Sequence, residues 1–136
     1  MTNTIVLYFS KTGITKNLAE NIAWKLNADI AEIHEAQIYT PADLKWNDPN
    51  SRTTIEQHQH QSRVVIQNDL PYISNYQNVI IAHPIWWGIP PRLIATLIDT
   101  LDLNGKKVAT CATSGGTGYL VHKILLNGLL KTTDNS

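Results

Sequence analysis

The fold of this chain is decided by the stretch Leu7-Tyr8-Phe9-Ser10-Lys11-Thr12-Gly13-Ile14-Thr15. An apolar run from Ile5 to Phe9 ends there at hydroxyl residues and a glycine, and an amphipathic helical pattern begins at Thr15. The stretch therefore predicts a strand, a tight loop and a helix. A strand that is apolar on both faces is typical of the parallel sheets of α/β proteins.

The tight loop has the composition of an anion-binding site. Backbone N–H groups at the first helical turn lack partners within the helix, and the helix dipole favours negative charge there. Ser10, Thr12 and Thr15 add hydroxyl donors, and Gly13 permits a close backbone approach or a positive φ angle. Ordinary helix capping is the alternative, but it needs one hydroxyl rather than three. The loop is neither a Walker A motif nor G-x-G-x-x-G, which leaves a phosphate monoester held without a metal.

The composition excludes several classes of protein. The 136 residues predict one domain, 1–136, and the 11 basic and 11 acidic residues cancel. This balance argues against nucleic acid or an anionic membrane surface as a partner. We expect no membrane insertion, because no apolar run approaches the roughly 20 residues needed to span a bilayer. The single cysteine, Cys111, fits a reducing compartment, so the cytoplasm is the expected location.

The remaining elements follow from apolar periodicity and turn signals. Strands are predicted over residues 28–34, 79–83 and 107–112, and helices over 16–27, 53–61, 91–101 and 119–130. The last six residues are expected to fray.

Three of the predicted apolar strands end in loops of special composition before a helix. In an open parallel sheet with right-handed crossovers, all three loops lie at the carboxyl edge, where ligands bind. The first loop offers phosphate donors, the second presents Trp86, Trp87 and Gly88, and the third is small and rich in backbone donors. A ligand with a phosphate, a polar linker and a planar ring would use all three, as flavin mononucleotide (FMN) would. In the alternatives, one tryptophan belongs to the core and the glycines form a plain turn.

These motifs resemble those of the flavodoxin-like proteins, in particular a short FMN-binding branch. Their hallmarks are a Ser-x-Thr-Gly-x-Thr loop, a Pro-x-Trp-Trp-Gly loop and a Gly-Gly-x-Gly loop. They appear here at residues 10–15, 84–88 and 115–118. The resemblance implies an α/β fold with an open parallel sheet in the order 2-1-3-4-5, and non-covalent FMN.

The resemblance also implies which residues contact the cofactor; no catalytic residue and no metal ligand is assigned. The implied contacts are Ser10, Lys11, Thr12, Gly13, Ile14, Thr15, Pro84, Ile85, Trp86, Trp87, Gly88, Thr113, Ser114, Gly115, Gly116 and Gly118.

The implied function is electron transfer through FMN, and two versions of it stay open. One is a cytoplasmic oxidoreductase that reduces small molecules such as quinones with NAD(P)H. The other is a one-electron carrier between protein partners, which the neutral charge disfavours because carriers of this family are typically acidic.

A shortened carboxyl end departs from the family pattern, because the fifth strand and the last helix of the family are not evident. The expected sheet order is therefore 2-1-3-4, with the fourth strand as an edge. An uncovered edge invites association, such as a homo-oligomer that covers it. A third function is thus a truncated module that works only in an assembly or not at all.

Overall fold

A computed structural model describes residues 3–11, 13–59, 61–86, 89–113, 119–125 and 132–134. Its strands are β1 (Thr4–Tyr8), β2 (Asp29–Glu32), β3 (Asn78–Pro84), β4 (Lys107–Thr113), β5 (Tyr119–Leu125) and β6 (Thr132–Asp134). Its helices are α1 (Ile14–Leu26), α2 (Arg52–His58) and α3 (Arg92–Thr100).

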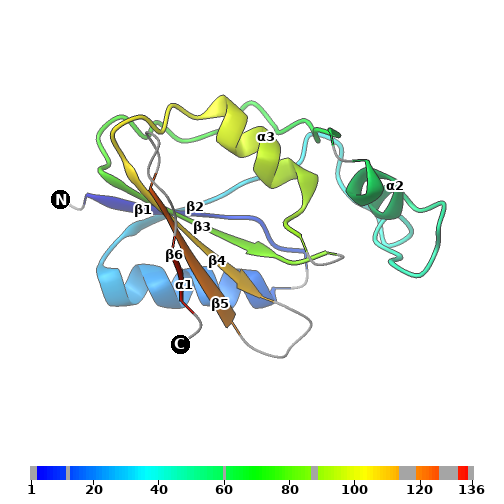
Figure 1. Ribbon diagram of the computed structural model, residues 1–136, viewed down its shortest axis with the longest axis horizontal. Coiled ribbons are helices and arrows are strands. Elements are labelled where there is room, and N and C mark those ends of the chain that lie inside the picture. The colour runs from blue at the N-terminus through cyan, green and yellow to red at the C-terminus, as the bar shows by residue number, and fades with distance from the viewer. Residues whose placement is uncertain are drawn as a thin grey trace.

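The strands form one sheet in the order β2-β1-β3-β4-β5-β6. The first four are parallel, which confirms the predicted α/β fold and the order 2-1-3-4. Helix α1 covers one face of the sheet and α3 the other, while α2 lies beyond the end toward which β1 and β3 run (Figure 1). The loops that follow the parallel strands therefore meet at this carboxyl edge.

Strand β1 is buried on both faces because its neighbours in the sheet and both helices surround it. Successive side chains of β1 point to opposite faces of the sheet. Ile5 and Leu7 pack in the core on the α3 side, and Val6 and Tyr8 pack in the core on the α1 side. All four side chains are less than 9% exposed, in agreement with the continuous apolar run in the sequence.

The prediction of a helix over residues 119–130 is wrong for residues 119–125. These residues form β5, which pairs antiparallel with β4 from Thr113↔Tyr119 to Lys107↔Leu125. Only five residues separate the two strands, a length that suits a hairpin. Short apolar runs do not distinguish a buried helix from a strand by periodicity alone, which explains the error.

The prediction that the fourth strand would be an edge of the sheet is therefore wrong for β4. Its outer side pairs with β5, and β5 pairs in turn with β6, where frayed residues were expected. A homo-oligomer was expected because β4 would be uncovered, and β4 is in fact covered by β5.

Candidate functional site

The first loop turns sharply at Gly13 and leads directly into α1. Gly13 has φ of 91° and is the residue that precedes the helix, so no side chain caps the first turn. Its own N–H donates to the Ser10 hydroxyl oxygen at 3.1 Å. Because the helix starts without a side-chain cap, its first N–H groups and the positive end of its dipole are available to an anion.

A hydroxyl pair ties this loop to the end of β4. Thr15 Oγ1 and Thr113 Oγ1 lie 2.7 Å apart, and both residues are buried. The start of α1 and the end of β4, which are 98 residues apart in the sequence, are thus joined directly.

Residues from the loop after β1 and the start of α1, from the end of β3 and the loop after it, and from the end of β4 line one pocket of about 330 Å³ at the carboxyl edge. The volume falls at the lower end of the range for ligand sites in proteins. The lining residues are Lys11, Ile14, Thr15, Trp46, Pro84, Ile85, Trp86 and Thr113.

Trp86 borders this pocket and also packs on the core. Its ring meets Phe9 edge-on with centroids 5.8 Å apart, and Tyr39 likewise at 5.6 Å. Its carbonyl accepts a hydrogen bond of 3.0 Å from the Gln57 side chain. The indole is thus held by aromatic neighbours and its backbone by α2, which gives the pocket a rigid aromatic wall.

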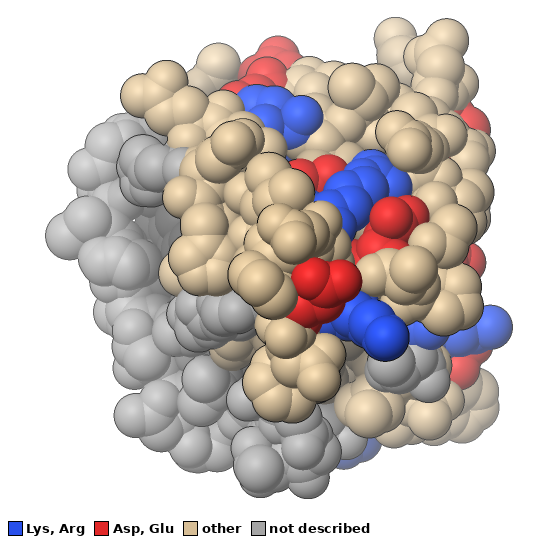
Figure 2. All heavy atoms as spheres, turned by 90° about the vertical axis from the view of Figure 1, so that its right-hand side faces the viewer, with Lys and Arg blue, Asp and Glu red and all other residues tan. Residues whose placement is uncertain are grey.

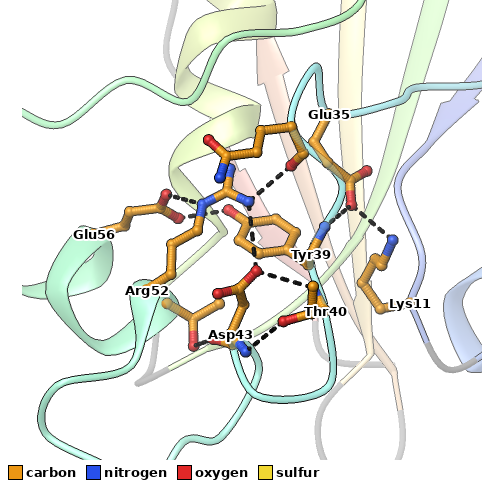
Figure 3. A network of polar contacts seen from close by, with 9 residues as sticks. Lys11, Glu35, Tyr39, Thr40, Asp43, Arg52 and Glu56 are labelled. Carbon is orange, nitrogen blue, oxygen red and sulfur yellow. Dashed lines mark hydrogen bonds and ion pairs between the residues drawn. The ribbon is translucent and has the colours of Figure 1, made fainter.

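Lys11 pairs with a carboxylate rather than pointing to solvent. Its Nζ lies 2.6 Å from Glu35 Oε2, and the Glu35 side chain is only 3% exposed (Figure 3). The same carboxylate oxygen accepts the backbone N–H of Tyr39 at 3.1 Å. The positive charge of Lys11 is therefore neutralised within the protein.

This pair sets the ionisation of Glu35. Burial by itself would raise the pKa of the carboxyl group. The hydrogen bonds from Lys11 and from the Tyr39 backbone, together with the Lys11 charge, outweigh burial and lower the pKa below its usual value. Glu35 is therefore ionised at neutral pH, and the contact with Lys11 is an ion pair.

A second group of charges supports Tyr39 from the side of α2 (Figure 3). The Tyr39 hydroxyl donates to Glu56 at 2.5 Å, and Arg52 Nε donates to the other oxygen of Glu56 at 2.8 Å. The Arg52 guanidinium carbon also lies 4.0 Å from the centre of the Tyr39 ring. Burial first, and then the Glu56 carboxylate, raise the pKa of Tyr39, so the phenol stays neutral.

The carboxyl edge presents both signs of charge next to each other. Figure 2 looks onto this side of the molecule, where lysine and arginine side chains lie beside aspartate and glutamate side chains. Lys11 with Glu35 and Arg52 with Glu56 are two such pairs. Among the described residues, this face therefore shows no continuous patch of one sign.

Part of the predicted site lies outside the described residues. These predictions concern Thr12, Trp87, Gly88, Ser114, Gly115, Gly116 and Gly118. The predicted residues that are described come from the loop after β1, the start of α1, the end of β3, the loop after β3 and the end of β4. They are Ser10, Lys11, Gly13, Ile14, Thr15, Pro84, Ile85, Trp86 and Thr113.

The sequence did not reveal Trp46 and Glu35. Trp46 lines the pocket from the connection between β2 and α2, and Glu35 holds Lys11. Both lie in the part of the sequence whose periodicity is weak. Tertiary contacts place them, such as the bridge between Glu35 and Ile66 in the case of Glu35.

The donors and rings of the pocket fit a phosphorylated planar ligand. Hydroxyl groups and an uncapped helix start lie on the side of Thr15, and the Trp86 ring forms another part of the wall. The space where a Cβ of residue 13 would stand is open: among the described residues, apart from Gly13 and its chain neighbours, no atom lies within 4 Å of it. This set of groups suits a phosphate monoester with an aromatic ring.

In the described part of the chain, no helix is both long enough and apolar enough to cross a bilayer.

Comparison with known proteins gives a consistent result. A family model described as flavodoxin matches residues 3–128. A candidate flavoprotein from Bacteroides uniformis ATCC 8492 is 39% identical, with a TM-score of 0.81 over 85% of this chain and 74% of the other. One from Bacteroides eggerthii DSM 20697 is 40% identical, with a TM-score of 0.82 over 86% and 74%.

A more distant structure includes the cofactor. The flavoprotein from Lactobacillus acidophilus NCFM in complex with FMN is 26% identical, with a TM-score of 0.61 over 86% of this chain and 78% of the other. No curated protein matches the chain.

Proposed function

Since this chain belongs to the flavodoxin family, we propose that it binds FMN at the carboxyl edge of the sheet and transfers electrons through it. The observation that carries the proposal is one pocket lined by residues at the carboxyl ends of β1, β3 and β4 and at the start of α1. The FMN complex of the Lactobacillus acidophilus flavoprotein supports the choice of cofactor. When bound, FMN supplies the one- and two-electron chemistry, which no side chain can supply alone.

The protein's own residues bind and orient the cofactor. The N–H groups of the first turn of α1 and the hydroxyl of Thr15, which lines the pocket, would hold the phosphate. The Ser10 hydroxyl, whose oxygen accepts the Gly13 N–H, would add a further donor. Because Lys11 is paired with Glu35, the phosphate would be held by neutral donors and the helix dipole rather than by a lysine charge. Trp86 and Pro84 would form the wall beside the ring and exclude water from it.

Titration of the purified protein with FMN tests the binding. We expect quenching of the flavin fluorescence, a defined stoichiometry and flavin absorption bands that stay with the protein on gel filtration. Absence of quenching at micromolar protein would refute the proposal.

Between the two versions of electron transfer, we favour reduction of small molecules such as quinones with NAD(P)H. The charges on the carboxyl edge alternate in sign (Figure 2), and such a surface gives little electrostatic steering toward a charged protein partner. A single free cysteine, Cys111, which is buried, suits the reducing cytoplasm as the place of action.

Steady-state kinetics separate the two versions. We expect the FMN-loaded protein to oxidise NADH or NADPH when a quinone is present. If the flavin is reduced only after a separate reductase is added, the protein is a one-electron carrier instead.

A further inference from the structure

Trp46 is exposed to an unusual degree for a tryptophan beside a pocket. Its side chain is 73% accessible, yet it lines the same pocket as Thr15 and Trp86. An indole in water leaves a large apolar surface unburied, and such surfaces next to ligand pockets commonly mark contacts with a partner or ligand.

The backbone just before Trp46 is held in place. The Lys45 carbonyl accepts the Ser51 hydroxyl at 2.8 Å. The Asp43 carbonyl accepts the N–H of Thr53 at 3.1 Å and its hydroxyl at 2.7 Å. These hydrogen bonds attach residues 43–45 to the start of α2, so the backbone that carries the exposed indole is held in position.

A hydrogen bond from α2 also holds the other tryptophan of the pocket. Gln57, on α2, donates to the Trp86 carbonyl at 3.0 Å. The connection that carries Trp46 lies beside α2 at the carboxyl edge (Figure 1). Trp46 and Trp86 are thus attached to one hydrogen-bonded unit, and both face one pocket.

We propose that Trp46 contacts the planar ring of the bound flavin and covers it from water. This inference rests on the proposed binding of FMN and adds a binding residue from the connection between β2 and α2. Contact with the ring would bury the apolar surface that the indole exposes. A residue that covers the ligand also slows its departure, so its loss should act mainly on the rate of dissociation.

Trp46→Ala and Trp46→Phe test the proposal, with Trp24→Ala as the matched control. Trp24 is 84% exposed but lies on α1, where it borders a different hollow with Ala23 and Ile30. The measurements are the FMN dissociation constant by fluorescence quenching, the dissociation rate by stopped flow, and the midpoint of urea unfolding without FMN.

We expect Trp46→Ala to weaken FMN binding about tenfold, the size of one lost aromatic contact, with most of the change in the dissociation rate. Trp46→Phe should recover much of the loss. Trp24→Ala should bind as the wild type does, and none of the three should change the unfolding midpoint much.

The possible failures are distinguishable. Absence of FMN binding by the wild type overturns the proposed function itself. Normal binding by the wild type with an unchanged dissociation constant and rate in Trp46→Ala overturns only the role of Trp46. Equal weakening by Trp24→Ala and Trp46→Ala also overturns it, because a general effect of losing an exposed indole would then explain the result.

Discussion

The Thr15 hydroxyl lies 2.7 Å from the Thr113 hydroxyl, and this contact joins the first loop of the site to the end of β4. Either group can donate, and both residues are buried, so among the described residues each hydroxyl satisfies the other. The two loops are therefore expected to respond together when one hydroxyl is removed.

We predict that Thr15→Val and Thr113→Val each lower the free energy of unfolding by about 1–2 kcal/mol, because each leaves one buried hydroxyl unpaired. The double variant should lose less than the sum, since it leaves no hydroxyl behind. Urea unfolding of the four proteins measures the coupling. Thr15→Val combined with Thr100→Val on α3, whose hydroxyl bonds to Thr96, is the additive control. Strict additivity of the first pair would contradict the hydrogen bond.

Gly13 allows a comparison between backbone strain and binding. Gly13→Ala places a Cβ in open space but at φ of +91°, and Gly105→Ala does the same at +77°. We predict that both lower stability by about 1–2 kcal/mol, the cost of a left-handed conformation for alanine. Only Gly13→Ala should also weaken FMN binding, because Gly105 lies in the turn before β4, at the edge of the sheet opposite the pocket. Equal FMN affinity in the two variants would exclude the first loop as the phosphate site.

The parts of the fold that can be predicted from the sequence are those whose structure depends on residues close together in the chain. Val79 and Ile81 are fully buried in β3, as a continuous apolar run requires, and α3 begins directly after Pro91. In contrast, Tyr119 to Leu125 could be a helix or a strand by composition, and pairing with β4 decides in favour of β5.

The parts of the site that the sequence misses depend on long-range contacts. Glu35 looks like an ordinary surface residue in the sequence, but it is 2% exposed because Lys11 and the Tyr39 backbone satisfy its charge. Trp46 stands among turn signals, and only the folded chain brings it to the pocket. Local patterns carry no information on either contact, whereas the loops after β1, β3 and β4 follow from the topology of a parallel sheet.

Glu35→Gln should test how much the buried ion pair contributes. The amide keeps the shape of the side chain but not its charge, so we expect a loss of about 1–3 kcal/mol in the free energy of unfolding. Asp99→Asn is the control, because Asp99 and Arg63 also form a direct pair, at 2.9 Å against 2.6 Å for Lys11 and Glu35, but the Asp99 side chain is 62% exposed. That variant should change stability by less than about 1 kcal/mol. If the two variants lost the same free energy of unfolding, burial of the Glu35 pair would add nothing to its contribution to stability.

The lowered pKa of Glu35 predicts a pH dependence of stability. Because the folded pKa lies below the unfolded one, the folded state binds fewer protons at this group, and its contribution is complete above the unfolded value of about 4.3. The contribution is lost as the pH falls through the folded pKa. The difference in stability between the wild type and Glu35→Gln should therefore be constant near neutral pH and shrink in acid. Urea unfolding across the acid range measures it, and a difference that does not depend on pH would contradict the assignment.

Gln57 connects α2 to the loop that carries Trp86, although its side chain need not contact the ligand. Its Nε2 donates to the carbonyls of Trp86 at 3.0 Å and Pro90 at 3.2 Å, and its Oε1 accepts the N–H of Arg92 at 3.0 Å. We predict that Gln57→Ala lowers the free energy of unfolding by about 2–4 kcal/mol, because backbone groups in a largely buried position lose their partners. Urea unfolding measures the loss.

The effect of Gln57 on the site is separable from its effect on stability. Gln59→Ala, at an exposed position just after the same helix, should stay within about 0.5 kcal/mol of the wild type and bind FMN equally well. Gln57→Glu retains the acceptor for Arg92 but replaces the donor to the two carbonyls with a second acceptor. If the donor positions Trp86, Gln57→Glu should weaken FMN binding as much as Gln57→Ala does, in conditions where both proteins are fully folded. Wild-type affinity in Gln57→Glu would instead mean that the packing of Phe9 and Tyr39 on the Trp86 ring is sufficient to hold it.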